Sequence, residues 1–334
     1  MTSTSSNALT RFLTIVTVIL LCNCDPISDL SIRQRLQPAP SNSGFKMDNY
    51  WVWGGSMIKA EGQYHLFASR WKKDIKFPDN YRHNSEIVRA VADKPLGPFE
   101  FAEIVIGERD SSFWDANMAH NPTVHKIGDE FVLFYNASDF TTLLDNSKNL
   151  LRRVGYASSK SIYGPWQRSD RPIVDAEANN PAVLVLNDKV LLMYRDAPLR
   201  VFVAQSDNYK GPYAIVNDNV WPEHKIEDFY MFKMKNSYHF ICEDNVGGIS
   251  GRERWGVHLS SKNAIDQWSK YDSLIVYDHD IPFTDGTVLH CERRERPQLL
   301  IENNKITHLI TGVYDGNNSW CQPVALSPPY NLDR

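Results

Sequence analysis

The sequence predicts an all-β protein, a five-bladed β-propeller. Short apolar runs bounded by turn residues are typical of strands and occur throughout the chain. One two-strand layout recurs five times, and helix signals are few; residues 261–268 are the one segment where we expect a short helix. Five repeats of about four strands each are the layout of a five-bladed propeller. The alternative, a β-sandwich, requires no regular repeat.

Each repeat begins with a predicted hairpin of constant size. The first residue of the hairpin lies 10 residues before the start of its second strand in all five repeats. These pairs are Gly54 with Tyr64, Asn121 with Phe131, Asn180 with Val190, Asp228 with Tyr238, and Arg296 with Ile306. Further apolar strands are predicted at 87–92, 154–158, 201–205 and 255–259, and Gly-Pro turns with an aromatic residue follow three of them, at Gly97, Gly164 and Gly211. No Pro-, Gly- or Ser-rich linker divides the chain, so we expect one domain over residues 45–330.

The first 24 residues are predicted to be a signal peptide. Arg11 precedes the apolar run 12–21, which is too short to span a bilayer but suits a signal-peptide core. A buried N-terminal strand is the alternative. Cys24 is a candidate lipid acceptor of the lipoprotein type, and an anchor there would be the only membrane contact. We therefore expect a secreted, periplasmic or cell-surface protein.

Charge and cysteine content exclude several classes of function. The net charge is −4, with acidic and basic residues interleaved, so no basic stripe is present to bind nucleic acid. Beyond the signal peptide, Cys242, Cys291 and Cys321 are an odd, widely spaced trio without a CxxC pair. We therefore expect no metal site and no cofactor. An axial Ca²⁺ is compatible with the many oxygen ligands, but no calcium-binding loop is readable.

The opening residues of the five hairpins are predicted to meet at the mouth of the propeller axis, because the first strand of each hairpin lines that axis. We call these five positions the slots. They hold Gly54, Asn121, Asn180, Asp228 and Arg296, and the residues just before them are Trp53, His120, Asn179, Glu227 and Glu295. Amides and carboxylates bind hydroxyl groups, and an indole face stacks on a sugar ring, so a carbohydrate pocket is predicted. Alternatively, the Asn-Pro and Arg-Pro pairs only mark strand starts.

These stretches resemble the five-bladed glycosidases of glycoside hydrolase families 32, 43, 68 and 117, and most closely the family-43-like hydrolases. The resemblance covers roughly residues 45–325. It rests on Val52-Trp-Gly-Gly-Ser-Met-Ile with 64–70, His120-Asn-Pro-Thr-Val, Asn180-Pro-Ala-Val-Leu-Val with Tyr194-Arg195, Glu227-Asp228 and 292–298. It implies hydrolysis of a glycosidic bond by a general acid, a general base and a third carboxylate that tunes the acid. Exo-action on a xylose-, arabinose- or galactose-type end is also implied.

The resemblance matches Glu227 to the general acid. Asp228 could share the role, although neighbouring strand residues point to opposite faces, so only one of the two is expected to reach the axis. The slot that carries the family's base holds Gly54, which leaves Asp48 and Asp115 as candidate bases. The slot of the tuning carboxylate holds Asn180.

The remaining candidates are predicted to bind substrate. His120 and Arg296 are candidates for ring hydroxyls or for the carboxylate of an acidic sugar. Arg195 and Glu295 either bind substrate or form an ion pair that holds the blades in register. Trp53, Asn121 and Asn180 complete the set.

We therefore expect an exported, monomeric glycosidase that acts on plant or algal polysaccharide fragments. Two alternatives stay open. The asparagines in the slots favour a carbohydrate-binding propeller that has lost catalysis. A phosphorylase would require basic residues for phosphate, for which Arg293, Arg294 and Arg296 are candidates.

Overall fold

The computed structural model describes residue 1 and residues 30–143 and 149–333. The predicted signal peptide and Cys24 therefore lie, apart from Met1, outside the described residues. Within the described ranges, no helix combines the length and the apolar composition needed to cross a membrane.

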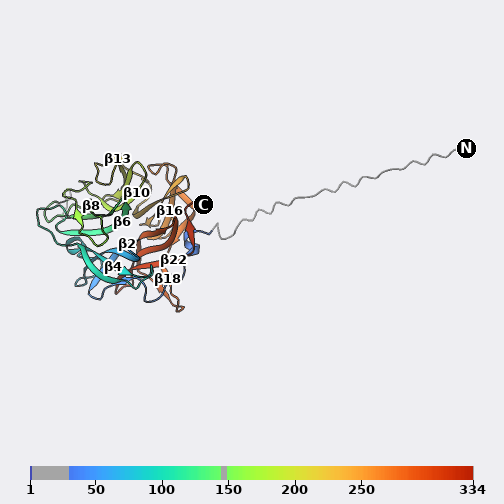
Figure 1. Cartoon of the computed structure of the whole chain (residues 1–334), viewed down its shortest axis with the longest axis horizontal. Coiled ribbons are helices and arrows are strands. Elements are labelled where there is room, and N and C mark those ends of the chain that lie inside the picture. The colour runs from blue at the N-terminus through green and yellow to red at the C-terminus, as the bar shows by residue number, and fades with distance from the viewer. Residues whose placement is uncertain (2–29, 144–148, 334) are drawn as a thin grey trace.

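The described residues form five four-stranded antiparallel sheets, the blades of a β-propeller (Figure 1), which confirms the predicted fold. Blade 1 contains β2 (Tyr50–Ala60), β3 (Gln63–Lys72), β4 (Glu86–Ala92) and β5 (Glu100–Ile106). Blade 2 contains β6 (Met118–Ile127), β7 (Glu130–Ser138), β8 (Arg153–Ser159) and β9 (Gln167–Arg168). Blade 3 contains β10 (Asn179–Val185), β11 (Val190–Arg195), β12 (Val201–Ser206) and β13 (Ala214–Asn217).

Blade 4 contains β14 (Ile226–Met234), β15 (Ser237–Asp244), β16 (Trp255–Ser261) and β17 (Ser269–Tyr277). Blade 5 contains β20 (Arg293–Glu302), β21 (Lys305–Tyr314), β22 (Ser319–Asn331) and β1 (Phe45–Lys46). A small hairpin of β18 (Asp280–Pro282) and β19 (Val288–His290) precedes blade 5. The two short helices are α1 (Ile32–Arg35) and α2 (Tyr81–Asn84).

The hydrophobic core lies between the blades. Five large clusters each combine buried residues of two neighbouring blades, and together they cover all five blade interfaces. In β3, Leu66 packs toward blade 5 and its neighbour Phe67 packs toward blade 2. Because side chains alternate along a strand and both faces of a blade are covered, the inner strands are continuous apolar runs.

The first strand closes the ring. Phe45 in β1 pairs with Cys321 in β22, so the earliest strand of the chain completes the last blade. Phe45 is buried against residues of blades 1 and 5. Ile32 and Ala39 are also buried, so chain that precedes residue 45 packs against the propeller.

The segment 261–268 is not a helix, contrary to the prediction. The Asn263 Oδ1 atom accepts hydrogen bonds from the backbone N–H groups of Ile265 and Asp266. Ala264 and Gln267 have φ angles of 64° and 53°, in the left-handed region. An asparagine side chain that accepts bonds from the backbone two and three residues further on offers an alternative to helical hydrogen bonds, and here the segment forms a loop.

Candidate active site

A β-bulge lies at every predicted slot. The pairing register of the innermost hairpin shifts at Gly54, Asn121, Asn180, Asp228 and Arg296, and these residues have φ angles between 52° and 64°. A bulge bends its strand and redirects the side chains around it. The alternation rule therefore fails here: Glu227 and Asp228 both line the pocket, whereas only one of them was expected to reach the axis.

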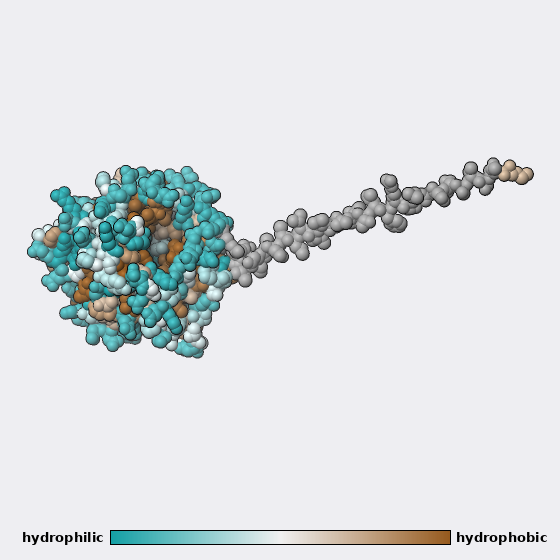
Figure 2. Space-filling view, viewed as in Figure 1, coloured by the Kyte–Doolittle hydropathy of each residue, from teal (hydrophilic) through white to brown (hydrophobic). Residues whose placement is uncertain are grey.

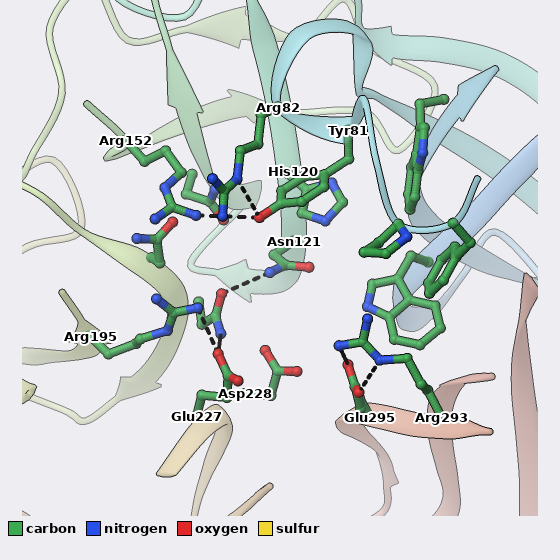
Figure 3. Close-up of a pocket in the computed structure, with 17 residues that line it drawn as sticks. Tyr81, Arg82, His120, Asn121, Arg152, Arg195, Glu227, Asp228, Arg293 and Glu295 are labelled. Carbon is green, nitrogen blue, oxygen red and sulfur yellow. Dashed lines mark hydrogen bonds and ion pairs between the residues drawn. The ribbon is translucent and has the colours of Figure 1, made fainter. Parts of the chain in front are cut away.

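The bulges surround a pocket of about 250 Å³ (Figure 3). Of the predicted site residues, eight line it: Trp53, His120, Asn121, Asn180, Arg195, Glu227, Asp228 and Glu295. Figure 2 shows one face of the molecule hollowed near its middle, inside a mainly hydrophilic rim.

Glu227 is a carboxylate bound by three donors. Arg195 Nη2 lies 2.6 Å from its Oε2 atom, and Asn180 Nδ2 donates to the same oxygen at 3.3 Å. Asn245 Nδ2 donates to Oε1. The donors come from blade 3 and from the end of β15, so Glu227 is fixed across the interface of two blades.

Asp228 is in a different environment from its neighbour. Burial, followed by the negative charges of Glu227 and Glu295, raises the pKa of Asp228 to about 7, and Arg296 opposes this shift. The Arg296 guanidinium is 3.8 Å away, and no hydrogen bond from any described residue reaches the Asp228 carboxyl group. Asp228 therefore retains its proton up to near-neutral pH, while its neighbour is ion-paired.

Glu295 stands on the other side of Asp228 and is held by two arginines. Arg293 Nε donates to its Oε1 atom at 2.6 Å, and Arg254 Nη1 donates to it at 2.8 Å. Arg195 is bonded to Glu227 instead, so the Arg195–Glu295 ion pair that the sequence suggested is not formed.

Arg296 crosses the axis below the pocket. Its side chain is fully buried, and its Nη2 atom donates to the backbone carbonyls of Asn121 and Pro181, both at 3.1 Å. Arg296 does not line the pocket, so the structure does not place it where its contact with substrate was predicted. A Cβ atom at Gly54 would lie 2.9 Å from Asn121 Oδ1 and 3.4 Å from Arg296 Cγ. Asn121 and Arg296 thus occupy the space that the side chain of a carboxylate at the Gly54 slot would need.

The structure brings neither candidate base into the pocket. Asp48 lines a separate depression with Asn49, Tyr50 and Lys72–Asp74. The Asp115 side chain is fully buried, with Arg109 Nη1 at 2.8 Å and the Tyr135 hydroxyl donating at 2.9 Å. Asp115 is satisfied by these donors beneath blade 2, and it serves the packing of that blade.

An aromatic wall faces the acidic residues. Trp53, Trp71, Phe77 and Tyr81 line it, and Phe77 stacks on Trp71 with ring centroids 5.7 Å apart. His120 adjoins this wall, and its Nδ1 atom lies 2.8 Å from Ser85 Oγ. Burial, then Arg296 and Arg152, lower the pKa of His120 to about 3, so it is neutral in the pocket.

Several pocket residues were missed by the sequence reasoning. Cross-strand register would have located one of them: Asn136, which lines the pocket, lies opposite His120 on the neighbouring strand. Others come from loops that carry no such signal. The loop 73–85 supplies Phe77, Tyr81 and Arg82, and Arg152 precedes β8.

Three buried carboxylates are the donors that an axial cation would use. One oxygen each of Asp228, Glu243 and Glu295 lies within 4.8 Å of the others. The Arg254 Nη1 atom already bonds both Glu243 and Glu295. Burial and neighbouring carboxylates raise the pKa of Glu243 well above its ordinary value.

Comparison with known proteins identifies the architecture. No family model and no curated protein matches the sequence. Among solved structures, the catalytic domain of a Coprinopsis cinerea family 62 α-L-arabinofuranosidase matches with a TM-score of 0.65 at 14% identity, covering 90% of this chain and 100% of that one. A family 117 glycoside hydrolase of Zobellia galactanivorans matches at 0.62 and 12%, covering 90% and 91%.

A family 43 β-xylosidase/α-arabinofuranosidase from a compost metagenome, in complex with xylotriose, matches with a TM-score of 0.59 at 12% identity and covers 86% and 95% of the two chains. At these identities the likeness establishes the fold. The chain has the architecture of the propeller glycoside hydrolases of families 43, 62 and 117, of which the resemblance in sequence had named families 43 and 117.

Proposed function

We propose that this propeller is a glycoside hydrolase that works with a pair of adjacent carboxyl groups. The observation that carries the proposal is the contrast between Asp228, whose pKa lies near 7, and the ion-paired Glu227 on the same bulge. Glycosidases require one protonated and one ionised carboxyl group beside the scissile bond. The solved structures of this fold include arabinofuranosidases and a xylosidase, which supports the same chemistry.

Asp228 is the proton donor in this proposal, and Glu227 is the ionised group. Asp228 transfers its proton to the leaving glycosidic oxygen as the bond to the sugar breaks. In the same step Glu227 either accepts a proton from the water that attacks the sugar carbon, or attacks that carbon itself and forms a glycosyl ester. In the second case water hydrolyses the ester, and Asp228, which has lost its proton, takes the proton of that water. The resemblance gave the acid role to Glu227; the three donors around that carboxylate favour exchanging the two roles.

The pocket size supports exo-action. A volume of about 250 Å³ lies below the usual range of about 300–1,000 Å³ for larger ligands. It suits a single terminal sugar whose ring stacks on the aromatic wall, with Asn121 and Asn180 binding hydroxyl groups. We propose that the substrate is a plant or algal polysaccharide fragment with a xylose-, arabinose- or galactose-type end. We also propose that the protein is a monomer exported through residues 1–24, with Cys24 as a candidate lipid anchor.

A carbohydrate-binding propeller without catalysis is the second candidate. The slots at Gly54 and Asn180 lack the carboxylates that the family pattern places there. The phosphorylase alternative is weaker, since only Arg293 of its three arginines lines the pocket. Arg294 is buried and donates to the backbone carbonyls of Asp278 and Asp280.

The test is release of reducing sugar from a panel of aryl glycosides and of plant and algal oligosaccharides, with Asp228→Asn in parallel. Loss of a general acid lowers turnover by about a hundredfold or more. Asp170→Asn, at a carboxylate whose side chain is 89% exposed, is the matched control and should keep full activity. Binding of panel sugars without any turnover would select the binding propeller instead.

A further inference from the structure

Two arginines stand on the wall opposite the acidic pair. Figure 3 shows Arg82 and Arg152 beside Tyr81, across the pocket from Glu227 and Asp228. Arg82 Nε donates to the Tyr81 hydroxyl oxygen at 3.1 Å, and Arg152 Nη1 donates to the same atom at 3.4 Å. The two side chains come from blades 1 and 2, and the tyrosine oxygen holds them together at the pocket wall.

Arg82 forms no ion pair with any residue that the structure describes. Four arginines line the pocket, and three of them have a carboxylate partner: Arg152 with Glu177 at 2.8 Å, Arg195 with Glu227 at 2.6 Å, and Arg293 with Glu295 at 2.6 Å. Among the described residues, no carboxylate lies within ion-pair distance of Arg82. Its bonds go to neutral oxygens, those of Tyr81 and Asn149, and none is made by its Nη2 atom in the described part of the chain.

Tyr81 adds a further donor at the same place. Its hydroxyl oxygen accepts two N–H bonds from the arginines, and no described residue accepts its own O–H. A phenol that already accepts two bonds has its proton left to donate. The Tyr81 O–H and the free N–H groups of Arg82 are thus available to one anionic ligand group.

The positive charge at this pocket wall contrasts with the negative net charge of the whole protein. The chain carries a net charge of −4, yet the wall formed by Tyr81, Arg82 and Arg152 presents to the cavity an arginine that has no ion-pair partner in the described part of the chain. Such a wall attracts anions and disfavours cations. Neutral sugars offer only hydroxyl groups, which do not require a positively charged guanidinium at the wall of the pocket.

We propose that Arg82, Arg152 and Tyr81 form a subsite for an oxyanion carried by the terminal sugar, either the carboxylate of a uronic acid or a sulfate ester. Both groups present paired oxygens that match the fork of a guanidinium. The inference rests on the proposed function for the position of the sugar, with its ring on the aromatic wall and its glycosidic bond at Asp228. It narrows the substrate class to acidic oligosaccharides.

The test compares binding of charged and neutral sugars by calorimetry. Glucuronate and galacturonate represent the carboxylate, galactose 6-sulfate represents the sulfate ester, and glucose and galactose are their neutral counterparts. We expect one of the two anion classes to bind about tenfold or more tightly than its counterpart, because hydrogen bonds to a charged group are the stronger ones. The class that gains identifies the source of the anion.

Variants locate the effect. Arg82→Ala should remove the preference for the anion, Arg82→Lys should restore part of it, and Arg171→Ala, at an exposed arginine outside the pocket, should leave it intact. Unchanged thermal unfolding of Arg82→Ala shows that its fold is kept. Equal affinity for charged and neutral sugars, including no measurable affinity for either, overturns the subsite, and so does a preference that survives Arg82→Ala.

The subsite and the hydrolase proposal fail separately. Turnover of neutral glycosides with no anion preference contradicts the subsite alone. Anion preference that depends on Arg82, with no turnover of any glycoside, contradicts the hydrolase proposal and leaves the subsite standing.

Discussion

At the residue scale, each slot is a bulge whose backbone lies in the left-handed region. This conformation favours glycine, asparagine and aspartate, which occupy four of the five slots, and costs more for Arg296. Strain of this kind is concentrated at functional sites. Here it places two adjacent carboxyl groups in one cavity, which a regular strand cannot do.

Asp115, predicted from the sequence as a candidate base, stabilises the fold instead. We expect Asp115→Ala to lower the free energy of unfolding by about 3–5 kcal/mol, because it removes the fully buried carboxylate that half-buried Arg109 and Arg168 share. Urea unfolding measures this loss. Asp170→Ala removes an exposed partner of Arg109 and should change stability by less than about 0.5 kcal/mol. A loss of similar size in both variants would contradict the structural role.

The sequence located the slots but not the full pocket. Constant hairpin spacing identified Glu227, Asp228 and His120, because a bulge recurs at the same place in every blade. Asp48 and Asp115 were named only because they precede a blade, and proximity in sequence did not bring them to the axis. Tyr81, Arg82 and Arg152 were missed, since loops between strands follow no repeat that fixes their direction.

At the element scale, the inner hairpins share one register. Residues before the slots pair with Ser69, Asn136, Arg195, Glu243 and Gly312 at the ends of the second strands. Packing explains the glycine in blade 5, because a Cβ atom at Gly312 would lie 2.9 Å from the Trp53 ring. In blades 2 and 3 this register also brings a residue of the second strand, Asn136 or Arg195, into the pocket lining.

Closure of the ring by β1 should contribute strongly to stability. We expect Phe45→Ala to cost about 3–5 kcal/mol, because the side chain is buried where blades 1 and 5 meet. Lys46→Ala is the matched control on the same strand. Its exposed side chain lies over the Trp320 ring, with Nζ 5.5 Å from the ring centroid, so a loss of about 1 kcal/mol or less is expected. Chemical denaturation measures the free energy of unfolding of both variants. Equal losses of stability in the two would show that closure of the ring does not depend on Phe45.

At the scale of the whole molecule, the repeats made the fold predictable. Five hairpins of equal size require five blades, and the continuous apolar strands require partners on both faces, which only a closed ring supplies. The extension of packed chain to Ile32 was not predictable, because α1 belongs to no repeat.

Buried histidines should make the molecule acid-sensitive. Burial lowers the pKa of six of them in the folded state: His65, His120, His125, His239, His258 and His308. In the unfolded chain their pKa is about 6.5, so that chain binds more protons below this pH and stability falls as pH drops toward 4. Each group contributes up to about 1.4 kcal/mol per pH unit.

Asp228 and Glu243 act in the opposite direction, because their raised pKa values favour the folded state as pH falls. Six groups outweigh two, so urea unfolding should show a net loss of stability between about pH 6.5 and 4.5. His258→Phe should reduce that slope. A stability that is constant or rises over this range would contradict the account.

The most direct test of the central claim is the turnover of two aryl glycosides of one sugar, with a poor and a good leaving group, by the wild type, by Asp228→Asn and by Glu227→Gln. If Asp228 is the acid, its variant loses a hundredfold or so with a poor leaving group and recovers much of that rate with a good one, which departs without protonation. Glu227→Gln should remain slow with both, because the ionised group is needed whatever leaves. Recovery by Glu227→Gln and not by Asp228→Asn, or full activity in Asp228→Asn, would contradict the assignment.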